Sequence, residues 1–209
     1  GFKHSRPVEV GKVNSGHFCF DVYGSVLNAI YLSNIYTEPI SWEFWQVTRK
    51  LIDYVCAHWD EPDDGIWDFD DRKSDETNRR HFTISKMMCW VCLDRGIKLA
   101  HERSFPAPFH AWKRTRDEIY ASVQEKGFNK KTNTYVQSYD SAQVDAALLL
   151  MPVMGFSSPS DPKFLSTLHF ILRPILAGGL TSNGLIHQTI PESESDQNER
   201  MFGVTQSTC

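Results

Sequence analysis

The chain has 209 residues, of which 41% are hydrophobic and 23% charged, a composition ordinary for one globular domain. Its formal net charge is −4, and its basic residues are dispersed, so no basic stripe predicts a nucleic-acid partner. No signal peptide, N-glycosylation sequon or apolar run of membrane-spanning length is present. No membrane partner is therefore expected, and a cytoplasmic location is favoured.

The five cysteines are an odd number in a chain of this size and do not indicate a disulfide framework. Cys89 and Cys92 form a lone CxxC inside an apolar helical pattern, with no second pair and no histidine at zinc-ligand spacing. We expect buried structural thiols there, no metal and no cofactor. The chain opens on Gly1 and stops at Cys209, which indicates a piece of a longer protein.

The first half of the chain predicts three helices. Residues 18–36 carry apolar residues on more than one face, which predicts a helix covered on two sides. Ser41 is a suitable N-cap for a second helix that runs to about Trp59. A third helix, capped by Thr83 or Ser85, runs to about Arg103 and has apolar stripes on two faces, as an inner helix does. The buried stripe of the second helix is predicted to contain Phe44, Val47, Leu51, Val55 and His58.

The second half predicts three more helices and little strand. The fourth begins near Pro106 or Pro108, runs to about Lys126 and is amphipathic, as an outer helix is. A short extended piece at 134–139 precedes a fifth, apolar helix over 144–154, which holds a single acid, Asp145. Asp161 and Pro162 cap a sixth helix to about Leu176, and the chain beyond Leu180 is polar and turn-like. An all-α fold follows, in which alternating two-sided and one-sided helices suit a bundle, a solenoid or an α/α toroid.

The connection between the second and third predicted helices, residues 58–71, is rich in acids and turns and contains Trp59 and Trp67. Pro62 and Gly65 end the preceding helix. A carboxylate beside an indole suits a sugar, because the ring packs on the apolar face while the acid reaches a hydroxyl or a glycosidic oxygen. The alternative is a solvated acidic loop with Trp67 in the core, since charge runs usually face water.

Several segments, taken in order, resemble the catalytic domain of glycoside hydrolase family 15, which includes glucoamylases, related α-glucosidases and trehalases. The segments are Ser-Arg-Pro-Val at 5–8, Phe-Asp-Val-Tyr-Gly at 20–24, Glu-Pro-Asp-Asp-Gly-Ile-Trp-Asp at 61–68, residues 81–95, Gln-Ser-Tyr at 137–139 and Asp-Ala-Ala-Leu-Leu at 145–149.

The resemblance implies an (α/α)6 barrel, present here as an incomplete one. All of residues 1–209 are expected to belong to one catalytic domain whose N-terminal and C-terminal parts lie outside the chain. An open barrel of this kind leaves apolar helix faces uncovered, which favours aggregation of the isolated chain. The implied activity is inverting, exo-acting hydrolysis of α-glucosides, with starch, maltooligosaccharides or trehalose as partners. No prediction is made for the oligomeric state.

The family places its general acid, a glutamate, directly after the Trp of its Gly-Ile-Trp-Glu segment, and that position here is Asp68. Aspartate sets the carboxyl back by one C–C bond, about 1.5 Å, and misplacement of that order costs about 100-fold in rate. The family usually has Arg two residues later, where this chain has Asp70. A second acid there raises the pKa of Asp68 or records sequence drift. Residues 71–78 resemble an insertion.

The resemblance further implies a sugar site lined by Trp67, Arg6, Tyr139 and Asp145. For Trp67 the alternative is a core position, and for Asp145 a structural hydrogen-bonding role. No stretch of the chain matches the family's general-base segment, and Glu199 is not assigned as the base. The family's sugar-binding Arg is replaced by His187 or Gln188.

Two other functions stay open on the sequence. The substitution at position 68, the lost Arg and the unmatched base segment are what a catalytically impaired relative that binds a glycan or another protein would show. A helical-repeat interaction module is the third possibility.

Overall fold

The computed structural model describes residues 18–67 and 79–190, together with the backbone of a short strand at 204–205. The predictions made for Arg6, Asp68, Asp70 and Glu199 lie outside these residues.

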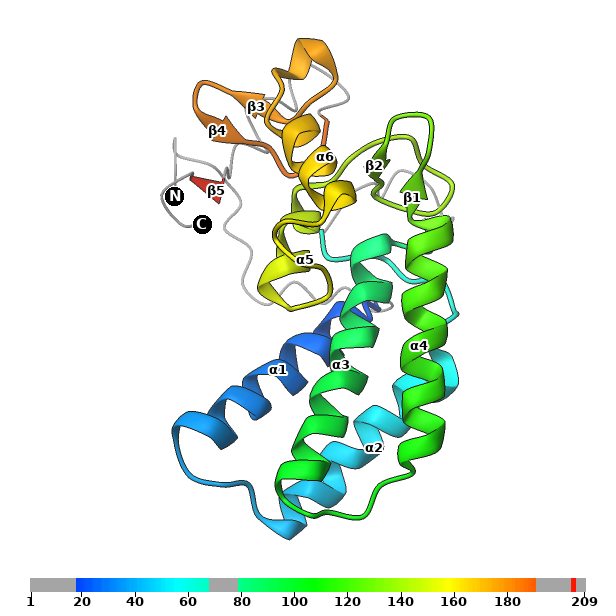
Figure 1. The fold of residues 1–209 in the computed structure, drawn as a ribbon, viewed down its shortest axis with the longest axis vertical. Coiled ribbons are helices and arrows are strands. Elements are labelled where there is room, and N and C mark those ends of the chain that lie inside the picture. Colours follow the sequence, from blue (N-terminus) through cyan, green and yellow to red (C-terminus); the bar gives the residue numbers. More distant parts are fainter. Residues whose placement is uncertain (1–17, 68–78, 191–203, 206–209) are drawn as a thin grey trace, which may run out of the picture.

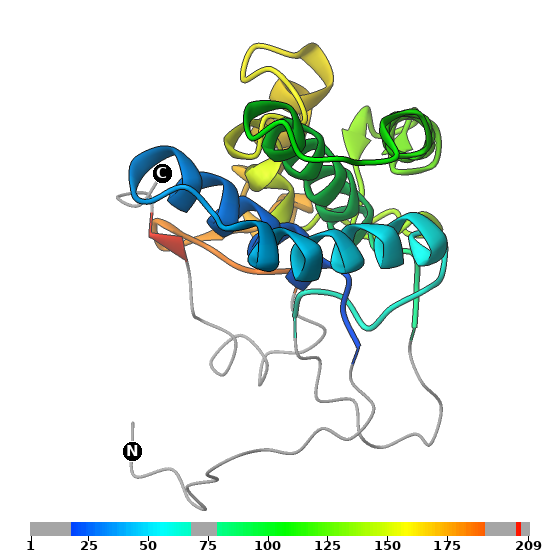
Figure 2. The same cartoon turned by 90° about the horizontal axis from the view of Figure 1, so that it is seen from below.

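Four long helices form the main body: α1 (Asp21–Tyr36), α2 (Trp42–His58), α3 (Thr83–Glu102) and α4 (Phe109–Lys126). α3 packs against the other three, and Figure 1 shows it between α1 and α4. Seen from below in Figure 2, α1 and α2 lie in one layer, and α3 and α4 lie above them. All four helices were predicted, and the predicted all-α fold is confirmed.

α3 is the inner helix of the described structure, as its two apolar stripes predicted. Sixteen of its 20 residues are buried. Cys89 and Cys92 have no exposed surface, which confirms the prediction of buried thiols, and burial raises the pKa of both well above the ordinary value for cysteine. Because α3 is enclosed, its N-terminal end is a fixed platform for the loops that meet there.

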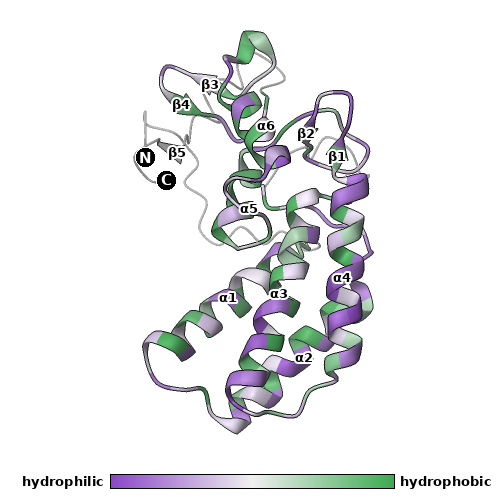
Figure 3. Ribbon diagram, viewed as in Figure 1, coloured by the Kyte–Doolittle hydropathy of each residue, from purple (hydrophilic) through white to green (hydrophobic). Residues whose placement is uncertain are grey.

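α4 lies outside α3 and buries one stripe, formed by Trp112, Thr115, Ile119 and Val123. Figure 3 shows hydrophilic residues over much of its remaining surface. The indole Nε1 of Trp112 donates a 2.9 Å hydrogen bond to Asp53 of α2, which joins the two helices across the core. The prediction of an amphipathic outer helix is confirmed.

The predicted N-cap of α2 is confirmed, and its predicted buried stripe is right at Val55 but wrong at Phe44 and Val47. The Ser41 side chain accepts a 3.2 Å hydrogen bond from the backbone N–H of Phe44. Phe44 and Val47 are, however, 47% and 57% exposed. The large indole of Trp45 sets the buried face instead, because it stacks on the Phe105 ring at 5.3 Å. The residues that α2 buries are Trp45, Thr48, Ile52 and Val55.

α1 is covered on one side only, so the expectation of cover on two sides is wrong for the described structure. Gly24 lies so close to α3 that a Cβ there would overlap the carbonyl oxygen of Met88. The residues of α1 that are buried are Asp21, Gly24 and Leu27. The large apolar residues of α1 that are exposed are Val22, Val26, Leu32, Ile35 and Tyr36.

The rest of the described chain consists of short elements above the four helices (Figure 1). They are the hairpin β1 (Phe128–Asn129) and β2 (Thr134–Tyr135), the 3-10 helix η2 (Ala146–Leu149), α5 (Leu150–Val153), α6 (Pro162–Ile171), the 3-10 helix η3 (Ile175–Ala177), and the sheet of β3 (Thr181–Ser182), β4 (Leu185–Ile186) and β5 (Val204–Thr205). The sequence predicted only turn-like chain after Leu180, and this is wrong for the described residues, in which β3, β4 and β5 pair as a sheet.

The predicted fifth helix over 144–154 is wrong at its start. Asp145 has an extended backbone, with φ −137° and ψ 136°, and caps η2 instead of lying inside a helix. The predicted cap of α6 is confirmed, because the Asp161 side chain accepts hydrogen bonds from the N–H groups of Lys163 and Phe164. α6 ends at Ile171 and not at Leu176, since Pro174 follows and cannot continue the helical hydrogen bonds.

None of the helices in the described residues is both long and apolar enough to cross a membrane.

Candidate functional site

The loop after α2, described as far as Trp67, is tied down at its centre by Asp63. The backbone of Asp63 pairs with that of Arg80 through hydrogen bonds of 3.0 and 2.9 Å. Its buried carboxylate accepts a 2.8 Å hydrogen bond from the backbone N–H of Phe20, at the start of α1. The Asp64 carboxylate accepts a 2.7 Å bond from the N–H of Phe18. The acidic loop is therefore fixed to α1 and is not a fully solvated charge run.

Residues 137–139 run past the N-terminal end of α3 and pair with residues 81–83. The N–H of Thr83 donates to the carbonyl oxygen of Gln137 at 2.9 Å, and the N–H of Tyr139 donates to that of His81 at 3.1 Å. Gly65 packs directly on Phe82, where a Cβ would lie 2.9 Å from the ring. Gly65 also has a φ of +76°, which favours glycine. The described part of the family-like segment 61–68 and the family-like segment 137–139 therefore both lie at the N-terminal end of α3.

Trp67 and Asp145 are joined directly, although 78 residues separate them in the chain. The indole Nε1 of Trp67 lies 2.9 Å from Oδ1 and 3.0 Å from Oδ2 of Asp145. The backbone N–H of Ala147 donates to Oδ1 at 2.7 Å, and the side chain of Gln137 makes a further hydrogen bond to the carboxylate. This contact joins the loop after α2 to the start of η2.

The Asp145 carboxyl is 1% exposed, and this burial raises its pKa to about 6. Burial disfavours the charged form, while the hydrogen bonds from Ala147, Trp67 and Gln137 favour it and limit the rise. All three partners are neutral donors. The carboxyl therefore titrates in the range where a proton can be held or released near neutral pH.

The segment at 187–188, where the family resemblance places a sugar-binding position, lies beside Asp145. The N–H of Ala146 donates a 2.9 Å hydrogen bond to the carbonyl oxygen of Gln188. His187 is buried, and its Nδ1 has no hydrogen-bond partner among the described residues. The chain thus brings 187–188 next to the carboxylate that holds Trp67.

Tyr139 has different partners from Trp67. Its hydroxyl group lies 3.1 Å from Oγ of Ser122 on α4, and its ring stacks on His81 with 5.9 Å between the ring centroids. Burial raises the pKa of Tyr139 to about 12. Tyr139 is near the site through His81 and α4, and the contacts of its hydroxyl group tie it to the outer helix.

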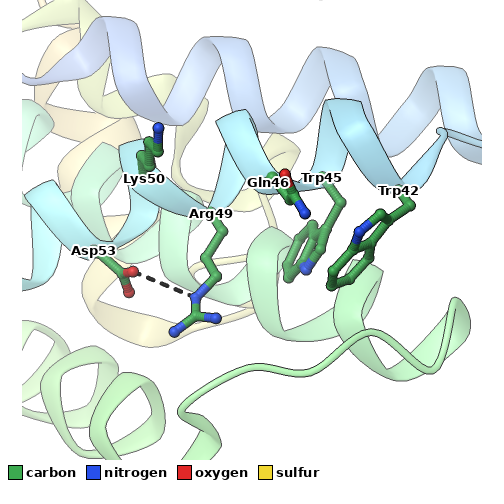
Figure 4. A pocket seen from close by; sticks show the side chains of 6 residues that line it. All are labelled: Trp42, Trp45, Gln46, Arg49, Lys50 and Asp53. Carbon is green, nitrogen blue, oxygen red and sulfur yellow. Dashed lines mark ion pairs between the residues drawn. The ribbon is translucent and has the colours of Figure 1, made fainter.

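A separate hollow of about 370 Å³ lies along α2 and is lined by Trp42, Trp45, Gln46, Arg49, Lys50 and Asp53. Figure 4 shows the two indoles side by side and the Arg49–Asp53 ion pair, which is 3.4 Å long. The hollow extends along α2 as far as Asp53, and α2 ends at His58, so at 1.5 Å per residue about 7.5 Å of helix lies between the hollow and the acidic loop. The hollow shares no residue with the Trp67 site.

In the described residues, no three His, Cys, Asp or Glu side chains gather as metal ligands would. The polar groups at the Trp67 site are one carboxylate, an indole and an amide, and they are hydrogen-bonded to one another.

The sequence model of Glycosyl hydrolases family 15 matches residues 1–201. The chain belongs to this family. It is 33% identical over 189 residues to a trehalase of Mycobacterium tuberculosis, and this alignment covers 90% of the chain and 27% of that relative. It is 36% identical over 182 residues to a trehalase of Thermoplasma volcanium, covering 86% of the chain and 28% of the relative. The chain thus spans less than a third of the length of these relatives.

Solved structures of glycosidases share the fold of this chain. A glycosidase variant in complex with glucose superposes with a TM-score of 0.63 at 22% identity, covering 83% of the chain and 43% of that structure. A wild-type glycosidase superposes with a TM-score of 0.62, at the same identity and coverage. The described helices therefore form part of an (α/α) toroid.

The family residues predicted from sequence divide into three groups in this structure. Trp67 and Asp145 are in direct contact. Tyr139 lies at the same helix end with other partners, and Arg6 and Asp68 lie outside the described residues. Gln137, which also bonds to Asp145, lies in one of the family-like segments but was not predicted as a site residue, because an amide gives no signal until its partner carboxylate is known.

Proposed function

We propose that the complete protein containing this chain is an inverting, exo-acting α-glucoside hydrolase with trehalose as its substrate. The observation that carries the proposal is the similarity to several trehalases of bacteria and archaea, at 32% to 36% identity over 80% or more of the chain. A glucan cut from its non-reducing end is the other substrate class that the family resemblance implies.

The proposal assigns the general acid to Asp68. In an inverting reaction the acid protonates the glycosidic oxygen, while a second carboxylate removes a proton from a water that attacks the anomeric carbon from the opposite face. Trehalose and one water then give one β-glucose and one α-glucose. No stretch of the chain resembles the family's base segment, so the proposal assigns the base to a carboxylate outside these 209 residues.

The proposal places Trp67, Arg6 and Tyr139 at the sugar, with Asp145 behind Trp67. The indole N–H of Trp67 is already bound to Asp145, so a sugar would meet Trp67 through its ring and not through that N–H. Tyr139 would contribute through its ring or hydroxyl group at the N-terminal end of α3.

The test is turnover of trehalose, maltose and p-nitrophenyl α-glucoside by the complete protein and two variants at one position. Asp68→Asn keeps the side-chain size and removes the acid, so trehalose turnover is expected to fall at least about 100-fold. Asp68→Glu restores the family residue and extends the carboxyl by about 1.5 Å, so its rate is expected to equal or exceed the wild-type rate. Early NMR spectra are expected to show α- and β-glucose in equal amounts.

Three results would count against the proposal in different ways. An Asn variant as active as the wild type removes Asp68 from the mechanism. Early release of α-glucose alone replaces inversion by retention. A wild-type protein with no turnover of any of the three substrates favours the catalytically impaired glycan- or protein-binding relative, for which the aspartate at position 68 is the supporting observation.

A further inference from the structure

Asp145 makes more hydrogen bonds than its capping position on η2 requires. A capping carboxylate needs only the backbone N–H groups of the helix start, as Asp161 of α6 shows with Lys163 and Phe164. Asp145 caps Ala147 in the same way but also receives the Trp67 indole on both oxygens and the Gln137 side chain. Three elements of the chain are thus held by one carboxylate.

The two capping aspartates, Asp145 and Asp161, also differ in how deeply they are buried. Asp161 is only partly buried, whereas Asp145 is 1% exposed. A buried carboxylate loses its hydration, and this cost is offset only by good hydrogen bonds. Bonds to an ionised acceptor are roughly twice as strong as bonds between neutral groups. The Asp145 carboxylate is therefore a firm anchor for the indole that donates to it.

The anchored indole belongs to the last described residue before the acid position. The earlier part of the loop is fixed at Asp63 and Asp64 by the backbone of Arg80 and the N-terminal end of α1. Trp67 is fixed independently, by Asp145 at the start of η2. The loop is therefore held at two points, and the second of these adjoins residue 68 in the covalent chain.

We infer that Asp145 is a positioning residue: its buried carboxylate fixes the indole of Trp67, the residue that directly precedes the proposed acid Asp68 in the chain. This inference rests on the proposed function. It also changes the role of Asp145, from a group that touches the sugar to one that acts through Trp67.

A positioning role predicts a particular kinetic pattern. Misplacing a catalytic group by about 1 Å costs about 100-fold in rate even when the substrate still binds. Loss of the Trp67–Asp145 bond should therefore lower kcat much more than it raises KM, because the acid acts in the transition state. A residue with only a structural role would instead lower the amount of folded enzyme and the Tm, without changing kcat per folded molecule.

The experiment compares four variants of the complete protein with trehalose as substrate. Trp67→Phe keeps a large ring and removes the N–H donor, and Asp145→Ala removes the acceptor; each is expected to lower kcat about 100-fold with KM changed less than about threefold. Asp145→Asn keeps one acceptor oxygen, so its kcat is expected to lie between those of Asp145→Ala and the wild type. Asp161→Asn changes the other aspartate cap and is expected to retain the wild-type kcat.

The double variant Trp67→Phe/Asp145→Asn decides whether the two residues act together. If they act through one bond, the double variant loses no more kcat than Trp67→Phe alone. Multiplicative losses, or a kcat per folded molecule that stays at the wild-type value in the single variants, would overturn the positioning role while leaving the proposed function intact. A wild type without trehalose turnover overturns the proposed function and the positioning role with it.

Discussion

The ammonium group of Lys86, buried in the first turns of α3, donates a hydrogen bond to the carbonyl oxygen of Glu61 in the acidic loop. The same nitrogen lies 5.0 Å from the centre of the Phe20 ring. Burial lowers the pKa of Lys86, and the nearby carboxylate of Asp63 works in the opposite direction. The inner helix α3 is therefore bonded to the loop at Glu61, two positions before Asp63.

Replacing Lys86 by Met is expected to destabilise the complete protein by about 2 kcal/mol, because the hydrogen bond from a charged donor to the Glu61 carbonyl oxygen is lost. The Tm, measured by circular dichroism, checks this. Lys98→Met is the matched control on the same helix: Lys98 is half-exposed and pairs with Asp94 at 2.8 Å, so its loss should cost less than about 1 kcal/mol. Equal losses in the two variants would contradict a special role for Lys86.

A second prediction concerns the contact between α1 and α3 at Gly24. A methyl group there would overlap the backbone of Met88, so Gly24→Ala must push the two helices apart. Overpacking of a core costs about 1–3 kcal/mol, and the upper part of that range is expected because the neighbour is backbone and cannot rotate away. Ser25→Ala, one residue on and exposed, should leave the Tm nearly unchanged. A Gly24→Ala variant as stable as the Ser25→Ala variant would show that α1 can shift freely.

The sequence predicted the helices well where apolar residues repeat with the helix period over several turns. It was less informative about which face is buried where a single large side chain determines that face. α3 and α4 were predicted with nearly correct bounds, since their apolar residues repeat over several turns. On α2 both Phe44 and Trp45 are apolar, and periodicity alone chose the stripe that contains Phe44. The stacking of Trp45 on Phe105 reversed that choice, and this contact joins α2 to the loop after α3.

The site was predicted in part. The family segments contain Trp67 and Asp145, but the contact between these residues joins positions 78 residues apart, and no local pattern contains it. Asp145 was placed inside a helix because an acid followed by two alanines and two leucines reads as part of an apolar run. Asp145 instead has an extended backbone and caps η2, and the next residue, Ala146, donates a backbone hydrogen bond to Gln188, 42 positions further along the chain.

A third prediction follows from the uncovered face of α1, which carries Val22, Val26 and Leu32. Contiguous exposed apolar surface promotes association, so the 209-residue chain produced alone is expected to elute as oligomers in size-exclusion chromatography and to bind a hydrophobic dye. The substitutions Val26→Lys and Leu32→Lys should shift the isolated chain toward monomer. A monodisperse isolated chain that melts cooperatively would contradict this expectation.

The last prediction uses the titration of Asp145, whose pKa burial raises from 3.8 to about 6. Between these two values the folded protein holds a proton that the unfolded chain has released. Unfolding therefore releases a proton, and the stabilising contribution of this group falls as the pH rises through the window. At 1.36 kcal/mol per pH unit, the full effect is at most about 3 kcal/mol.

The measurement is the Tm of the complete protein minus that of its Asp145→Asn variant, taken at several pH values. This difference is expected to fall from pH 3.8 to about pH 6 and to stay level above that, because the Asn side chain does not titrate. In a Trp67→Phe background the fall should extend to higher pH, since the indole N–H favours the charged carboxylate and its loss raises the pKa of Asp145 further. A difference that rises with pH would show that the folded state prefers the charged form, and that the hydrogen bonds from Trp67, Gln137 and Ala147 outweigh burial.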